Sequence, residues 1–272
     1  MDSIEAIFYA VDEVFKKMEK NTKTKRGRKS KMSHPEVISI VLWGHKKGLT
    51  TTKQLYQFSQ HYFRDTNFPS YVQFTRSIRK IGSYLDFFIH FLSQINVSKK
   101  SKYNIIDATS LPVNGYGKYQ PPKWAGKVKT GKNMFGFYHG FKLHVIVNAE
   151  LEIVSVHITE ANFHDVRALG EECFMKNISG KLIADKGYIS KKRAMELAKN
   201  QINIIAKQRE NMDPYLNEYY KMELSLRVRI ETVFAQIKNH FSAVYRFCRS
   251  VESFLVHTKA AICFYMLNKR VI

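Results

Sequence analysis

The sequence predicts an α/β protein in which an all-helical N-terminal module precedes a mixed five-stranded sheet flanked by helices. Two observations favour this class. Over residues 1–98, apolar side chains recur every three or four positions, as on one face of a helix. From residue 99 onward, short alternating or apolar runs typical of strands are separated by helical patterns. We therefore expect a helical module at 1–98 and an α/β domain at 99–272.

Composition restricts the class of partner. The 272 residues are 44% hydrophobic, which is enough for a sizeable core, and they include 44 Lys and Arg against 23 Asp and Glu, a formal net charge of +21. A charge of this size is usual in proteins that bind a polyanion. We expect no membrane span and no secretory signal, and the three cysteines are too few and too scattered for a disulfide framework. A cytoplasmic protein is the expectation.

Helix start signals organise the N-terminal module. An apolar face over residues 4–18 predicts the first helix, and the fifth is expected at about 84–95. Between them, a Ser or Thr is followed three residues later by Glu or Gln, the pattern of an N-terminal cap. This pattern occurs at Ser33 with Glu36, Thr51 with Gln54, and Ser70 with Gln73. Short capped helices joined by tight turns resemble a helix-turn-helix bundle.

The second part of the chain alternates between strand and helix patterns. A polar turn at Asn148–Leu151 predicts a β-hairpin, and later strands separated by helices predict parallel crossovers. We expect strands at 103–107, 136–148, 152–159, 181–185 and 202–206, and helices at 164–176, 190–200 and from 214 to the end.

Three acidic residues occupy positions where the local pattern does not predict a solvent-exposed face. Asp107 and Asp185 are each the last residue of an expected apolar strand, and Glu231 lies within an expected helix at 226–241. Taken singly, a strand-end aspartate is most often a turn former or a helix cap. Together, three carboxylates suit phosphodiester cleavage by two divalent ions held about 3.5–4 Å apart. The sequence separation of the acids is too large for spacing alone to show that they converge.

Basic residues near Glu231 have two interpretations. Arg227, Glu231 and Lys238 share one helical face. Arg227 and Glu231 would then form an ordinary surface ion pair. Alternatively, Glu231 binds metal while Arg227 and Lys238 hold flanking phosphates, which is the interpretation we favour.

Four segments of the second part of the chain are informative together: Ile105–Ser110, Gly140–His144, Thr159–Asp165 and Ala184–Tyr188. They resemble the DDE transposases of small bacterial insertion sequences, whose catalytic domain is RNase H-like. The similarity extends from about Tyr103 to the end and is weaker over the N-terminal module. The tyrosine of that family's last signature corresponds here to Leu224. In the order given, the four segments are similar to that family's first-aspartate strand, its second strand, the link after its third strand and its second-aspartate strand.

The resemblance implies a function and a site. Asp107 and Asp185 would lie on adjacent parallel strands, with Glu231 facing them from a helix, and all three would be catalytic and hold two Mg²⁺ or Mn²⁺ ions. The implied partner is double-stranded DNA, both terminal inverted repeats and target, bound by a homodimer or higher assembly near the nucleoid of a bacterium or archaeon. The alternatives are a non-catalytic repressor derived from a transposase and a structure-specific nuclease of the same fold.

Other basic residues are candidates for DNA contact. A basic run between the first two helices reads as a solvated linker or as an arm on phosphates or in a minor groove. The loop at 114–133 is expected to be flexible, and either merely disordered or able to grip DNA and stack a base on its tryptophan. His164 and Asp165 are expected to start a helix, with Asp165 as its cap. The DNA-binding candidates are Arg26, Arg28, Lys29, Arg76, Arg79, Lys80, Lys123, Trp124, Lys127, Arg227 and Lys238.

Overall fold

A computed structural model describes residues 3–19, 30–49, 51–63, 67–97, 101–207, 214–240 and 248–271. The chain forms two compact units, one made of Met1–Phe91 with Gln236–Ile272 and the other of Leu92–Ala235. The sequence predicts a boundary after residue 98. By packing, the C-terminal helix instead groups with the N-terminal helices, so its apolar residues contribute to the core of that unit.

The helical unit contains the capped helices that the sequence predicts. The side chains of Ser33 and Ser70 each accept a hydrogen bond from the backbone amide three residues on, and the Glu or Gln side chain there accepts one from the amide of the serine. The long apolar C-terminal helix packs against the second and fourth helices. The helices are α1 (Ile4–Glu19), α2 (His34–Lys46), α3 (Thr52–Tyr62), α4 (Tyr71–Lys80), α5 (Gly82–Val97) and α12 (Val251–Val271).

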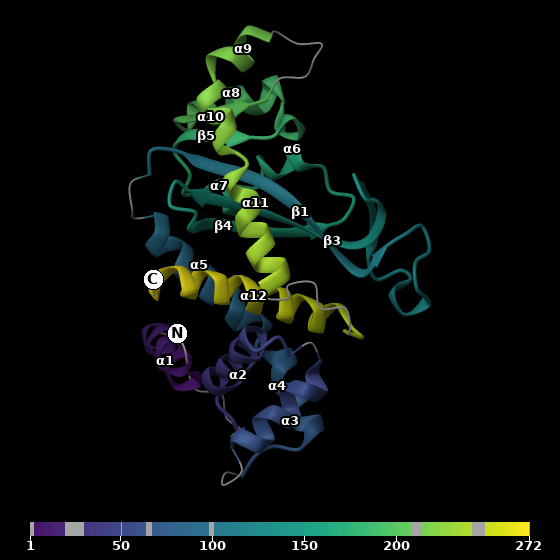
Figure 1. Cartoon of the computed structure of the whole chain (residues 1–272). Coiled ribbons are helices and arrows are strands. Elements are labelled where there is room, and N and C mark those ends of the chain that lie inside the picture. Colours follow the sequence, from purple (N-terminus) through teal and green to yellow (C-terminus); the bar gives the residue numbers. More distant parts are fainter. Residues whose placement is uncertain are drawn as a thin grey trace. The chain divides into compact units, whose positions relative to one another are not determined.

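The other unit is built on a mixed sheet, which confirms the predicted α/β class (Figure 1). Strands β4, β3 and β1 are antiparallel neighbours, and β1, β5 and β6 are parallel. The predicted hairpin joins β3 to β4. The strands are β1 (Asn104–Tyr116), β2 (Lys129–Asn133), β3 (Gly136–Asn148), β4 (Ile153–Glu160), β5 (Gly180–Ala184) and β6 (Ile202–Ala206).

Several element boundaries differ from the prediction. β1 continues nine residues beyond Asp107, so this aspartate lies within the strand and not at its end. Part of the expected flexible loop forms β2, which pairs with the first half of β3. The expected helix at 164–176 is two short helices, α6 (Asp165–Ala168) and α7 (Glu172–Met175), separated by a turn at Gly170. A glycine at that point interrupts the helical pattern.

Further helices connect the last strands and follow them along the chain. α8 (Lys191–Lys199) connects β5 to β6, and it begins at Ser190, whose side chain caps the backbone of Arg193. The expected helix from 214 is divided into α9 (Pro214–Tyr219), α10 (Lys221–Leu226), α11 (Arg229–Ala235) and the π-helical segment η3 (Gln236–His240). Within the described ranges, none of the helices combines the length and apolarity that crossing a membrane needs.

Candidate active site at the ends of the parallel strands

The sheet register places Asp107 and Asp185 next to each other. β1 and β5 are parallel, and Ile105 pairs with Ile183. Because side chains alternate between faces of a strand, the residues two positions further on lie opposite each other on the same face. Asp107 and Asp185 are those two residues. Asp185 is the residue directly after β5, so continuing the register by two positions brings it beside Asp107.

Arg227 connects these aspartates to Glu231. Its Nη1 lies 2.9 Å from Oδ2 of Asp107, its Nε 3.9 Å from Oδ1 of Asp185, and its Nη2 3.7 Å from Oε1 of Glu231. Each guanidinium nitrogen thus faces a different carboxylate. Arg227 is the C-cap residue directly after α10, and Glu231 lies in the first turn of α11, four residues on, so both side chains lie on one side of this helical segment. The three acids singled out from the sequence converge on one cation.

Burial controls the charge of the first aspartate. The side chain of Asp107 is 17% exposed, against 37% for Asp185 and 59% for Glu231. Loss of hydration raises the pKa of Asp107 to about 6, with the carboxylates of Asp185 and Asp165 adding to the rise. A hydrogen bond from the Ala108 amide, 2.7 Å long, and the charge of Arg227 oppose it. Asp107 is therefore the member of the set that most needs a cation beside it.

The donor chemistry of this set suits a hard divalent cation, since all three side chains offer carboxylate oxygens. In the arrangement around Arg227, however, no group of three or more His, Cys, Asp or Glu side chains among the described residues is placed to hold a metal ion. Arg227 stands where the carboxylates converge. The carboxylate oxygens fit the expected metal, and in this structure the Arg227 guanidinium supplies the positive charge between them.

Two further charged residues support the site, and the sequence analysis did not single them out for it. Lys142 on β3 donates to the carbonyl of Phe163 at 2.7 Å and to Oδ1 of Asp165 at 2.9 Å. Asp165 also lies close to Gly187, in the segment that follows Asp185. His164, not Asp165, occupies the cap position of α6, and no side chain caps that helix, so the expectation for Asp165 is wrong. A signal for this pair was present in the sequence, because Lys142 is a charged residue within an otherwise apolar strand and therefore needs a partner.

Tyr188 lies in the same segment. It is fully buried, and its hydroxyl has no hydrogen-bond partner in the part of the chain that the structure describes. Burial raises its pKa well above the usual value, and the carboxylates of Asp165, Asp107 and Asp185 act in the same direction. The phenol therefore stays neutral beside the acids and packs in the core beneath the sheet.

With this geometry in view, comparison with known families is informative. The family model described as "Transposase DDE domain" matches residues 97–250, more than half of the chain. The chain belongs to this transposase family. The match covers Asp107, Asp185 and Glu231 together with the sheet that positions the first two.

Solved structures similar to this transposase are also transposases. The piggyBac transposase synaptic complex with hairpin DNA is 11% identical, with a TM-score of 0.46 over 98% of this chain and 76% of that one. A pre-cleavage Mos1 transpososome is 10% identical, with a TM-score of 0.25 over 96% and 85% of the two chains. No curated protein sequence matches the chain. The TM-scores lie below 0.5, so the family assignment depends on the sequence match alone.

The transposase presents the predicted basic residues of α4 to solvent. Arg76, Arg79 and Lys80 are all exposed on this helix, whose cap is Ser70. Arg76 and Lys80 also line a pocket of about 280 Å³ together with Lys31. Basic side chains from α4 and from the residues just before α2 therefore line the same pocket of the helical unit.

The candidates in the loop after β1 have different positions. Lys123 and Lys127 are exposed, whereas Trp124 is completely buried. Stacking on a base needs an exposed ring face, so the expected role of Trp124 is wrong for this conformation; the ring instead fills the core of the loop. Lys238 lies in η3 of the helical unit, and burial lowers its pKa to about 8. Arg26, Arg28 and Lys29 lie outside the described residues.

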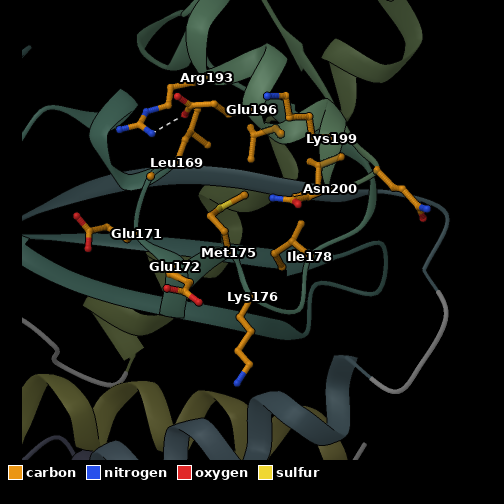
Figure 2. A pocket seen from close by; sticks show the side chains of 14 residues that line it. Leu169, Glu171, Glu172, Met175, Lys176, Ile178, Arg193, Glu196, Lys199 and Asn200 are labelled. Atoms are coloured by element: carbon orange, nitrogen blue, oxygen red, sulfur yellow. Dashed lines mark hydrogen bonds and ion pairs between the residues drawn. The ribbon is translucent and has the colours of Figure 1, made fainter.

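A separate pocket of about 560 Å³ lies between α7 and α8 (Figure 2). Its walls include Met175, Ile178 and Leu197, and an ion pair of 2.6 Å joins Arg193 to Glu196 at its edge. Neither the two aspartates nor Glu231 line it. The acidic site is therefore distinct from this pocket.

Proposed function

We propose that this chain is a metal-dependent DNA transposase, which binds the terminal inverted repeats of its element, cuts DNA at the element end and joins that end to target DNA. The observation that carries the proposal is the convergence of Asp107, Asp185 and Glu231 on one guanidinium. Side chains separated by 78 and 46 positions meet there, within a transposase-family domain. An ordinary surface ion pair involves two partners, whereas here three carboxylates share one cation.

In this proposal Asp107, Asp185 and Glu231 hold two ions, Mg²⁺ or Mn²⁺. When bound, such ions lower the pKa of a water molecule and stabilise charge on the attacking and leaving oxygens. The three acids position the ions beside the reacting phosphate. Arg227, once released from the acids, is available to bind a flanking phosphate. Hydrolysis by water breaks one P–O bond and leaves a 3′-hydroxyl on the element end and a 5′-phosphate on the flanking DNA. The 3′-hydroxyl then attacks a target phosphodiester, forming a new P–O bond as the target's own P–O bond breaks and a target 3′-hydroxyl leaves.

DNA contact is supported by the distribution of charge. The formal net charge of +21 favours a polyanionic partner. The exposed candidates are Arg76, Arg79 and Lys80 on α4, and Lys123 and Lys127 after β1. We assign these residues to the DNA backbone. Because joining both ends of an element uses two active sites, the working form is a homodimer or a higher assembly on DNA.

End cleavage tests the proposal. The purified chain is incubated with Mg²⁺ and a labelled fragment of the DNA that flanks its own gene. We expect cutting at the element end and, with target plasmid, joined products. Asp185→Asn is expected to lose both activities. Glu223→Gln is the matched control, because Glu223 lies on the preceding helix and pairs with Lys181, away from the three acids.

Three outcomes would overturn the proposal. Cutting by Asp185→Asn at the parental rate would remove the acids from the chemistry. Cutting by the parental chain without any joined product would identify a nuclease. Specific binding without cutting, together with no carboxylate-dependent Mn²⁺ binding in calorimetry, would identify a repressor.

A further inference from the structure

A basic arm with an apolar tip extends from the strand that carries Asp107. We define the arm as residues 114–137, from the end of β1 through β2 to the start of β3. It contains five lysines and no acidic residue; indeed no Asp or Glu occurs between Asp107 and Glu150. In Figure 1 the arm projects beyond the sheet where β1 ends and β3 begins. Its charge is unopposed along its own length.

The tip of the arm has an unusual composition. Asn133 pairs with Gly136, so Met134 and Phe135 are the two central residues of the turn between β2 and β3. Gly136, with φ +109°, takes the left-handed position that this hairpin needs. The two turn positions before it do not require apolar side chains, and turns usually carry small polar residues. Met134 is 90% exposed and Phe135 67%. Exposing these two side chains at a turn has no benefit for the folded chain alone.

Behind the tip, aromatic rings and lysines alternate. The ring of Tyr116 lies 5.5 Å from that of Phe135, centroid to centroid. Phe137 follows along β3, and the Nζ atoms of Lys118 and Lys132 lie 6.0 and 5.5 Å from its ring centroid. These side chains make a strip of rings in which Tyr116 and Phe135 adjoin each other and two lysines lie over the ring of Phe137. Such a strip suits a strand of nucleic acid, whose bases stack while its phosphates are neutralised.

The arm is also a built structure. Trp124 fills its core, and the side-chain amide of Gln120 donates to the carbonyls of Trp124 and Val128 at 3.0 and 3.1 Å. At the tip, Oδ1 of Asn133 accepts from the Phe135 amide at 2.9 Å, which fixes the turn. The apolar tip is therefore held in place before any partner arrives.

We propose that the tip of this arm, Met134 and Phe135 with Tyr116 behind them, engages unpaired or unstacked bases of DNA close to the cleavage point, while the arm's lysines hold the adjacent phosphates. The proposal rests on the proposed function and adds the state of the DNA that is bound. Tyr116 is nine residues from Asp107 on β1, which is at most about 30 Å at ~3.3 Å per residue. At ~3.4 Å per nucleotide, the contacted bases lie within roughly nine positions of the cut phosphate.

The test compares two variants of the whole chain. Met134→Ser with Phe135→Asn places small polar residues common in turns at the tip and keeps Gly136, whose φ is +109°, so the turn is retained while the apolar contact is lost. Met195→Asn is the matched control, because Met195 is 69% exposed on α8. Binding is measured by fluorescence anisotropy with a labelled single strand and with the corresponding duplex.

We expect the tip variant to bind the single strand about tenfold more weakly, equivalent to about 1.4 kcal/mol, with little change for the duplex. Replacing Lys118, Lys129 and Lys132 by Gln should weaken binding to both and reduce the salt dependence. Iodouracil crosslinks from the parental chain should fall within the nine positions estimated above.

Equal loss for duplex and single strand, or no loss in the tip variant, would overturn the proposal. So would weaker binding of the tip variant to anionic phospholipid vesicles with unchanged DNA binding, since the tip would then be a membrane contact. Failure of the proposed function is distinguishable from these results. In that case the parental chain neither cuts the element end nor binds Mn²⁺ through its acids, whatever the tip does.

Discussion

Replacing Arg227 by Gln removes the cation that three carboxylates share, and its effect on stability follows from the distances. Two unit charges 4 Å apart attract by about 4 kcal/mol at an effective dielectric constant of ~20. The nitrogen–oxygen distances here are 2.9, 3.9 and 3.7 Å. Most of this attraction is offset by lost hydration and side-chain entropy, and solvent screens the more exposed partners Asp185 and Glu231.

The net loss comes mainly from Asp107, which is the most buried of the acids and accepts the shortest bond. We expect Arg227→Gln to lower the free energy of unfolding of the metal-free protein by about 2–3 kcal/mol. The corresponding fall in melting temperature is roughly 5–10 °C. Urea unfolding in the presence of EDTA measures the change.

Adding MgCl₂ should then reduce the difference between the two proteins. In the parental chain an incoming ion competes with Arg227 for the same carboxylates, whereas in the variant it meets no competitor. Mg²⁺ should therefore stabilise the variant more, as expected when a ligand binds the folded state more tightly. Calorimetry with Mn²⁺ should show affinity at least about tenfold higher in the variant, or about 1.4 kcal/mol.

Arg229→Gln is the matched control, because Arg229 lies two residues away and donates to the hydroxyl of Tyr103 instead of to an acid. Its stability change should not depend on Mg²⁺. If Arg227→Gln and Arg229→Gln respond identically to Mg²⁺, then Arg227 does not occupy the position that the ions would take, and the reasoning fails.

Two further predictions concern the sheet. Burial lowers the pKa of His144 to about 3, below its unfolded value of ~6.5. Between these two values the unfolded chain binds a proton that the folded chain does not, so this histidine's contribution to stability is complete above pH ~6.5 and is lost as the pH falls toward 3. Between pH 6.5 and 5 the free energy of unfolding should fall by about 2 kcal/mol. His144→Gln should abolish this fall, as measured by urea unfolding. Gly140→Ala should cost about 3 kcal/mol or more, because φ is +152° and a Cβ would lie 2.3 Å from the carbonyl oxygen of Leu111. Gly126→Ala, at φ +72° in open space, should cost only about 1 kcal/mol in the same assay, and equal losses would contradict the steric argument.

Local patterns in the sequence were sufficient for the elements that local physics determines. The N-terminal helix caps at Ser33 and Ser70 are present as predicted, since such a cap depends on residues only three positions apart. The hairpin after β3 is also present, because its turn lies between two alternating runs. Here each residue's neighbours in sequence are also its neighbours in space.

Where tertiary pairing decides, local patterns were insufficient. β2 has the sequence Lys129–Asn133, with two Lys, one Gly and no apolar residue, and it is a strand only because the edge of β3 is available to it. One of the two alternatives for the loop at 114–133 was that Trp124 stacks on a base, yet its ring is completely buried. Similarly, Lys142 could be recognised as a charge in an apolar strand, but its partner Asp165 is 23 residues away.

The role of Arg227 shows how spacing and geometry complement each other. The sequence placed it on a face with Glu231 and favoured a phosphate over an acid as its partner; in the structure it pairs with the acids. Formal charges make the two roles compatible. Three carboxylates with one guanidinium sum to −2, which repels a phosphate; with two divalent ions in place of the guanidinium the sum is +1, which attracts one. If the proposed ions bind, the carboxylates no longer need Arg227, and the displaced guanidinium is at the site where a DNA phosphate has become favourable. The arginine that stabilises the resting acids is thus the residue best placed to bind the substrate once they hold metal.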